Sequence, residues 1–117
     1  MNQTKQEIFQ LLLNLHKQLL EEQKKEYEKT YGVIATTNQY FQLVVSHEDF
    51  EWLRQLSVLI SSFDEALESD NQDVTGVTKE LLLLLSGSGD EKFYRHLQLS
   101  THQELINQVI DLLKNLA

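Results

Sequence analysis

The chain has 117 residues, a net charge of −8, no cysteine and no proline. This length fits a single domain over residues 1–117 that buries a core without a disulfide or a structural metal. The 18 acidic and 10 basic residues disfavour a nucleic-acid partner, because phosphate binding needs clustered basic side chains. Without cysteine there is no thiolate nucleophile and no metal site built on sulfur.

Nothing in the sequence predicts a membrane span or a targeting segment. The longest apolar run covers residues 81–85, far below the ~18 residues of a membrane-spanning helix. The first ten residues lack the basic and apolar regions of a signal peptide and the Arg-rich character of a transit peptide. We therefore expect a cytoplasmic protein without a membrane partner.

The first predicted helix covers residues 5–31. Thr4 and Glu7 match a capping box at its start, and Gly32 is a natural left-handed residue after its end. At a rise of ~1.5 Å per residue this helix is about 40 Å long, longer than a compact domain of this size needs. We expect its second half to protrude or to pack against a second subunit.

The second predicted helix begins at another capping box, Thr36 with Gln39. Helical spacing directs four apolar side chains of this helix inward, namely Tyr40, Phe41, Val44 and Val45. Residues 46–49 then supply a cap and first-turn acids for the next helix.

The central predicted helix covers residues 50–67 and ends near Glu68. A turn of about 100° per residue gathers seven apolar side chains in one sector, namely Trp52, Leu53, Leu56, Leu59, Ile60, Phe63 and Leu67. The opposite sector holds Arg54, Ser57, Ser61 and Glu65. Trp52 is either a corner of the core or an exposed anchor for a partner, and its place in the apolar sector favours the core.

Three further helices are predicted after a polar stretch. The first covers residues 73–86 and carries five leucines, which face every direction and need neighbouring helices or a partner to cover them. After the break at residues 87–89, Asp90 caps a short helix that runs to about Leu97. Thr101 and Glu104 match a capping box for the last helix. The predicted fold is all-α, a helical bundle of four longer helices and one or two short ones.

Known catalytic and metal-binding patterns do not occur. No histidine follows an acid by three residues, as a di-iron bundle requires. His47-Glu48 begins like a zinc motif, but Glu51 stands where the second histidine belongs. No phosphate-binding glycine motif and no G-x-S-x-G is present. The sequence therefore predicts no cofactor and no metal, and it favours a non-catalytic protein.

A few polar residues are candidates for a site. His16 falls inside the apolar stripe of the first helix, where a hydrogen-bonded core histidine is favoured over a ligand. Arg54 lies about three turns from Asp64 and Glu65, too far to pair with either. Lys17 and Glu28 are expected partners for these charges, in a structural ion-pair lattice or in a ligand pocket.

The segments LxLHKxLLExxKxxYE at residues 13–28 and FxWLRxLSxLIxxxDE at residues 50–65 resemble a family of small helical bacterial proteins with no assigned activity. The resemblance covers about half of the chain and implies a helical fold and a bacterial origin. Members usually have prolines before the Phe-x-Trp segment and after its Arg, where this chain has Asp49 and Gln55. The resemblance makes the following residues the first to examine: His16, Lys17, Arg54, Ser57, Asp64 and Glu65.

The favoured hypothesis is a helical protein–protein interaction module that self-associates, with the first helix and the leucine-rich helix as contact surfaces. The alternative is a bundle that binds a small ligand or a metal in a polar pocket around His16, Arg54, Asp64 and Glu65. A helix-turn-helix regulator is disfavoured, because Glu48, Asp49 and Glu51 stand where a recognition helix needs side chains that read bases or phosphates.

Overall fold

The computed structural model describes residues 2–116, which form six α-helices and one 3₁₀ helix with no strand among them. The elements are α1 (Asn2–Tyr31), α2 (Thr37–Ser46), η1 (Glu48–Leu53), α3 (Arg54–Glu68), α4 (Thr75–Ser86), α5 (Glu91–Leu99) and α6 (Gln103–Leu116). The all-α prediction is confirmed. The predicted division into longer and short helices is approximate, because α4 has 12 residues and α2 has 10.

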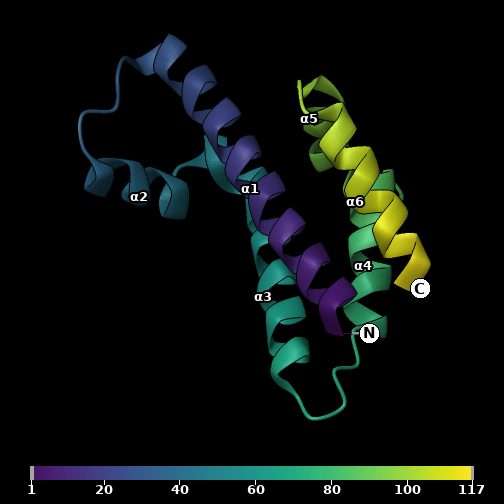
Figure 1. The fold of residues 1–117 in the computed structure, drawn as a ribbon. Coiled ribbons are helices and arrows are strands. Elements are labelled where there is room, and N and C mark those ends of the chain that lie inside the picture. The colour runs from purple at the N-terminus through teal and green to yellow at the C-terminus, as the bar shows by residue number, and fades with distance from the viewer. Residues whose placement is uncertain (1, 117) are drawn as a thin grey trace.

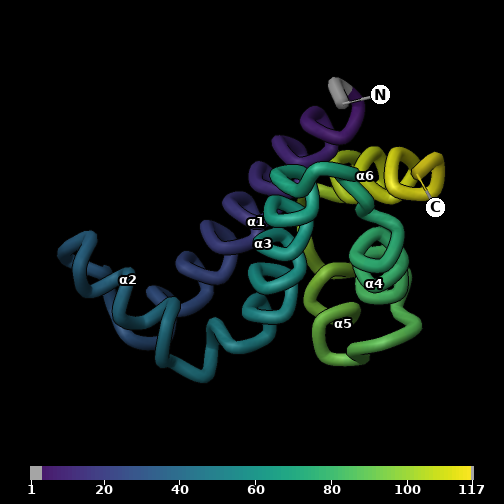
Figure 2. Tube along the Cα trace, turned by 90° about the horizontal axis from the view of Figure 1, so that it is seen from below, coloured from purple at the N-terminus to yellow at the C-terminus, as the bar shows by residue number. Residues whose placement is uncertain are grey.

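Four helices form a closed ring around the core. α1 contacts α3 and α6, and α4 contacts the same two helices. Figures 1 and 2 show α1 and α3 in the middle, with α2 on one side and α4, α5 and α6 on the other. None of the helices within residues 2–116 combines the length and the apolar character needed to cross a membrane.

The central segment supplies the largest share of this core. All seven predicted apolar residues of the sector that starts at Trp52 are buried. The segment is not one α-helix, however, because residues 48–53 form η1 before α3 begins. Three residues per turn place Phe50 and Leu53 on one face of η1, and both are buried.

Trp52 lies in the core and not on the surface as a partner anchor. It is 7% exposed, and its Nε1–H donates a hydrogen bond to Oε1 of Gln23 on α1 at 2.8 Å. Its ring also packs against Phe93 of α5, with the ring centroids 5.5 Å apart. The indole therefore joins η1, α1 and α5.

The predicted end of α1 is confirmed and its predicted cap is wrong. α1 begins at Asn2, so Thr4 lies inside the helix and does not cap it. At the other end Gly32 has a φ of +94°, the left-handed conformation that glycine adopts most easily. Its N–H donates to the Glu28 carbonyl and closes the last turn of α1.

The last turns of α1 extend beyond the bundle, and the chain then turns back to α2, which lies to the side (Figure 1). Tyr27 of α1 packs edge-on against the His47 ring, and Tyr40 of α2 packs against Phe50. The prediction that α2 turns Phe41 and Val45 inward is wrong, since both side chains are exposed and no residue of α2 is buried. The reason is that α2 contacts the bundle mainly through η1.

The last three helices begin and end close to the predicted positions. Gly87 ends α4 with a φ of +86°, and the Asp90 carboxylate accepts the Phe93 N–H as the cap of α5. The capping box at Thr101 is wrong, because α6 begins at Gln103. The Thr101 hydroxyl instead donates to Glu22 of α1.

Candidate binding groove

An open groove of about 330 Å³ lies where α1, α2, η1 and α3 meet. Nine residues line it: His16, Leu20, Val44, Val45, Phe50, Leu53, Arg54, Ser57 and Val58. We call it the α1–α2–α3 groove. Six of these residues are apolar and none is acidic, although the chain carries 18 acids.

Arg54 is the only residue of permanent charge in this lining. It begins α3, and its Nη2–H donates to the His47 carbonyl at 3.0 Å. Its Nε is buried and finds no hydrogen-bond partner within residues 2–116. Neither of the two ion pairs in that range, Lys29–Glu26 and His47–Asp49, includes Arg54.

His16 and Ser57 are the other polar residues of the groove. His16 is half-buried, and burial lowers the pKa of its imidazole below the usual value, because the charged form loses hydration. Ser57 follows Arg54 by one turn of α3 and therefore shares its face. At neutral pH the groove thus combines one cation, a neutral imidazole and a hydroxyl with apolar walls.

Large apolar side chains stand exposed around this groove. Val58 of α3 is 62% exposed, and Phe41 and Val45 of α2 are 61% and 55% exposed. Leu13 is 42% exposed, and its spacing of three from His16 places it on the same face of α1. Phe41 precedes Val44 by one turn of α2 and therefore lies on the same face. We call Leu13, Phe41, Val45 and Val58 the rim, and the seven lining residues other than Val45 and Val58 the floor.

Three of the six candidate residues from the sequence meet in this groove, and three do not. His16, Arg54 and Ser57 line it. Asp64 follows Arg54 by ten residues of α3, which is about 15 Å along the axis. Lys17 and Glu65 are exposed and Asp64 is half-buried, and none of them lines the groove. The expected partner Glu28 accepts the N–H of Ile34 instead of a side-chain cation.

The rim and Val44 were not singled out as a site by the sequence. A signal for two of these residues was present, because Leu13 and Val58 are apolar residues outside the buried stripes of α1 and α3. Val44 and Val45 gave no such signal. The exposure of Val44 and Val45 depends on how α2 packs against η1, and helical spacing does not reveal such a tertiary contact.

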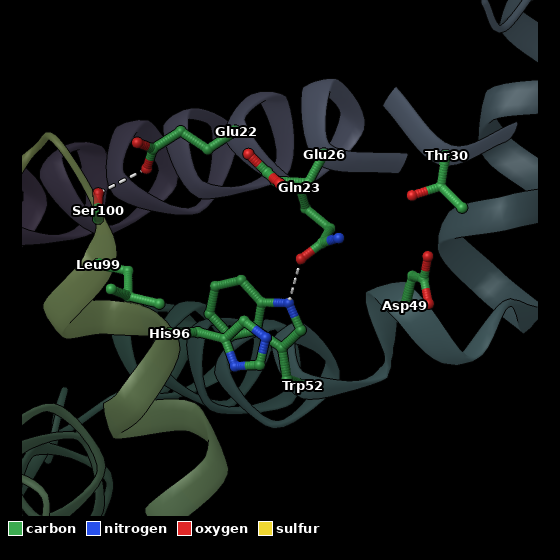
Figure 3. Close-up of a pocket in the computed structure, with 9 residues that line it drawn as sticks. All are labelled: Glu22, Gln23, Glu26, Thr30, Asp49, Trp52, His96, Leu99 and Ser100. Atoms are coloured by element: carbon green, nitrogen blue, oxygen red, sulfur yellow. Dashed lines mark hydrogen bonds between the residues drawn. The ribbon is translucent and has the colours of Figure 1, made fainter. Parts of the chain in front are cut away.

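A second groove, of about 590 Å³, lies between the second half of α1, η1 and α5. Figure 3 shows Glu22, Glu26 and Asp49 around it, with Trp52 and His96 at its base. The rings of Trp52 and His96 stack with their centroids 4.4 Å apart. This groove is acidic, in contrast to the α1–α2–α3 groove.

Glu22 holds α1 to the turn between α5 and α6 through hydrogen bonds. Its carboxylate accepts hydrogen bonds from the Ser100 hydroxyl and from the N–H and hydroxyl of Thr101. Burial alone would raise the pKa of Glu22, but these hydrogen bonds, with a smaller effect of His102, hold it below the usual value. No group of three His, Asp or Glu side chains in the part of the chain that the structure describes could hold a metal ion.

Comparison with known proteins adds no relative. No family model matches the chain, and neither a curated protein nor a solved structure is similar to it at a significant level. The resemblance inferred from residues 13–28 and 50–65 therefore stays a prediction.

Proposed function

We propose that this protein is a non-catalytic helical interaction module that binds a second copy of itself through the rim of the α1–α2–α3 groove. One observation carries the proposal: Val45 and Val58, which line the groove, are exposed apolar side chains. Leu13 and Phe41 are also exposed, and each lies one helical turn from a lining residue. Contiguous exposed apolar surface of this kind is typical of protein–protein contacts. The lack of cysteine supports a reducing, cytoplasmic setting.

Charge supports a second copy as the occupant. Two chains of net charge −8 repel each other wherever their carboxylates face. The α1–α2–α3 groove is lined without an acid, whereas the groove at Trp52 is lined by Glu22, Glu26 and Asp49. Two copies that meet through the same apolar patch form the isologous contact of a C2 dimer. Such pairing keeps the acidic groove of each copy away from the contact.

The leucine-rich α4 offers less surface for a partner. Leu81, Leu84 and Leu85 are buried and Leu82 is partly buried, so Leu83 alone of the five is exposed. The ring of helices covers the others. We therefore favour the rim over α4 as the contact surface.

Light scattering of the purified chain tests this proposal. The wild type is expected at twice the monomer mass of 13.7 kDa, and Val58→Glu at the monomer mass. Leu99→Glu is the matched control, because Leu99 is 80% exposed but lines the acidic groove, and it should keep the dimer. A monomeric wild type at 100 µM, or a dimeric Val58→Glu, would contradict the proposal.

A further inference from the structure

The floor of the α1–α2–α3 groove contains a cation that no acid of residues 2–116 neutralises. Of the five N–H donors of Arg54, one bonds the His47 carbonyl at 3.0 Å. The Nε donor is buried without a partner. A guanidinium offers pairs of parallel donors that match a carboxylate, so the chemistry of the site calls for an anionic group.

The residues around Arg54 favour a ligand whose anionic group is attached to an apolar part. Leu20, Val44, Phe50 and Leu53 form most of the floor, and the polar contribution comes from His16 and Ser57 beside Arg54. The groove volume of about 330 Å³ lies in the range of small-ligand sites. Apolar walls with a few convergent polar groups are typical of such sites.

The wall formed by α2 allows a ligand to enter. No residue of α2 is buried, and Val44 itself is only half-buried. Few buried contacts mean a low local stability, so α2 can move at small cost in free energy. A displacement of α2 at Val44 would widen the groove beside Arg54.

We propose that the floor of the α1–α2–α3 groove binds a small hydrophobic carboxylate, with its head on Arg54 and its hydrocarbon chain along Leu20, Val44 and Leu53. Ser57 and His16 lie beside the head. The ligand uses the floor, whereas the second copy uses the rim. The site therefore does not depend on the proposed dimer.

Calorimetric titration with decanoate tests the site on the full chain. Wild type should bind decanoate at least tenfold more tightly than 1-decanol, which lacks the charge, and butyrate, which lacks the chain. Arg54→Gln should weaken decanoate binding at least tenfold. The matched control is Arg95→Gln, because Arg95 is exposed on α5 and does not line the groove, and it should bind like wild type.

Equal affinity for decanoate and 1-decanol, or unchanged binding by Arg54→Gln, would overturn the proposal. Val44→Phe provides a second test that keeps Arg54, since the larger side chain fills the groove and should abolish binding. Circular dichroism confirms that each variant keeps its helices. Decanoate binding by a folded Val44→Phe as tight as that of wild type would also overturn it.

Phe41→Glu separates this proposal from self-association. Phe41 belongs to the rim and does not line the groove, so the variant should be monomeric and should bind decanoate like wild type. Loss of decanoate binding in a folded Phe41→Glu would overturn the ligand site as a property of the single chain. A dimeric Phe41→Glu that binds decanoate would contradict the proposed dimer and leave the ligand site supported.

Discussion

The Glu22 carboxylate accepts a hydrogen bond from the hydroxyl of Ser100, 78 residues later in the chain. The second carboxylate oxygen accepts the N–H and the hydroxyl of Thr101. Figure 3 shows the hydrogen bond between Glu22 and Ser100 at the side of the acidic groove. It joins α1 to the turn between α5 and α6.

Glu22→Gln should lower the free energy of unfolding by about 1–2 kcal/mol. Hydrogen bonds to a charged group usually contribute about 1.5–3 kcal/mol, and solvent around the half-buried Glu22 weakens them. Urea unfolding followed by circular dichroism measures the change. Glu26→Gln is the control, because Glu26 pairs only with the exposed Lys29, and such surface pairs contribute about 0–1 kcal/mol. A Glu22→Gln variant as stable as Glu26→Gln would show that the contact with Ser100 does not stabilise the fold.

The same contact predicts a pH dependence at the acidic end. The folded-state pKa of Glu22 lies below its ordinary value of 4.5, so the folded state favours the carboxylate. The stabilisation is complete above pH 4.5 and is lost as the pH falls through the lowered folded pKa. Between these two pH values the free energy of unfolding should fall more in the wild type than in Glu22→Gln. An equal fall in both chains would contradict the role of the Glu22 carboxylate.

His16 predicts a second pH window, closer to neutrality. Burial lowers the pKa of His16 from its ordinary value of 6.5, so the unfolded chain binds a proton more readily than the folded one. The contribution of His16 to stability is therefore complete above pH 6.5 and falls as the pH drops toward the lowered folded pKa. Unfolding at pH 7.5 and 5.5 should show a smaller loss of stability in His16→Gln than in the wild type. An equal loss in both chains would exclude this role for His16.

Two glycines should respond to alanine in opposite directions. Gly87 has a φ of +86°, and a Cβ there would lie 2.8 Å from the Tyr94 ring. Gly87→Ala should destabilise the fold by about 1–3 kcal/mol. Gly76 lies in α4 with open space around it, so Gly76→Ala should stabilise by about 0.5 kcal/mol, since alanine loses less entropy in a helix. Thermal melts of the two variants check both signs, and a shared direction would be inconsistent with these backbone assignments.

The sequence predicted the core better than it predicted the caps. Helical spacing identified the buried sector of the central segment, because a stripe that starts at Trp52 depends only on local geometry. The capping patterns at Thr4 and Thr101 failed for different reasons. Helix α1 already begins at Asn2, and Thr101 bonds Glu22 from a distant part of the chain.

Only half of the candidate site could be predicted, because contacts between distant parts of the chain decide which residues meet. His16 could be selected as a polar residue inside the apolar stripe of α1, and Arg54 and Ser57 as polar residues of the sector opposite the buried stripe of the central segment. Whether they converge depends on the packing of α1 against α3, which the spacing along each helix does not determine. The rim depends further on α2, whose exposed side chains follow from its loose contact with η1.

The most direct test of the central claim is a distance between two copies of the chain. The protein has no cysteine, so Val58→Cys and Leu99→Cys each accept a single spin label, and pulsed electron paramagnetic resonance measures the separation between labels. A dimer through the rim predicts a short, narrowly distributed distance for residue 58 and a longer one for residue 99. A longer distance at residue 58 than at residue 99, or no dipolar signal from either label, would contradict the account.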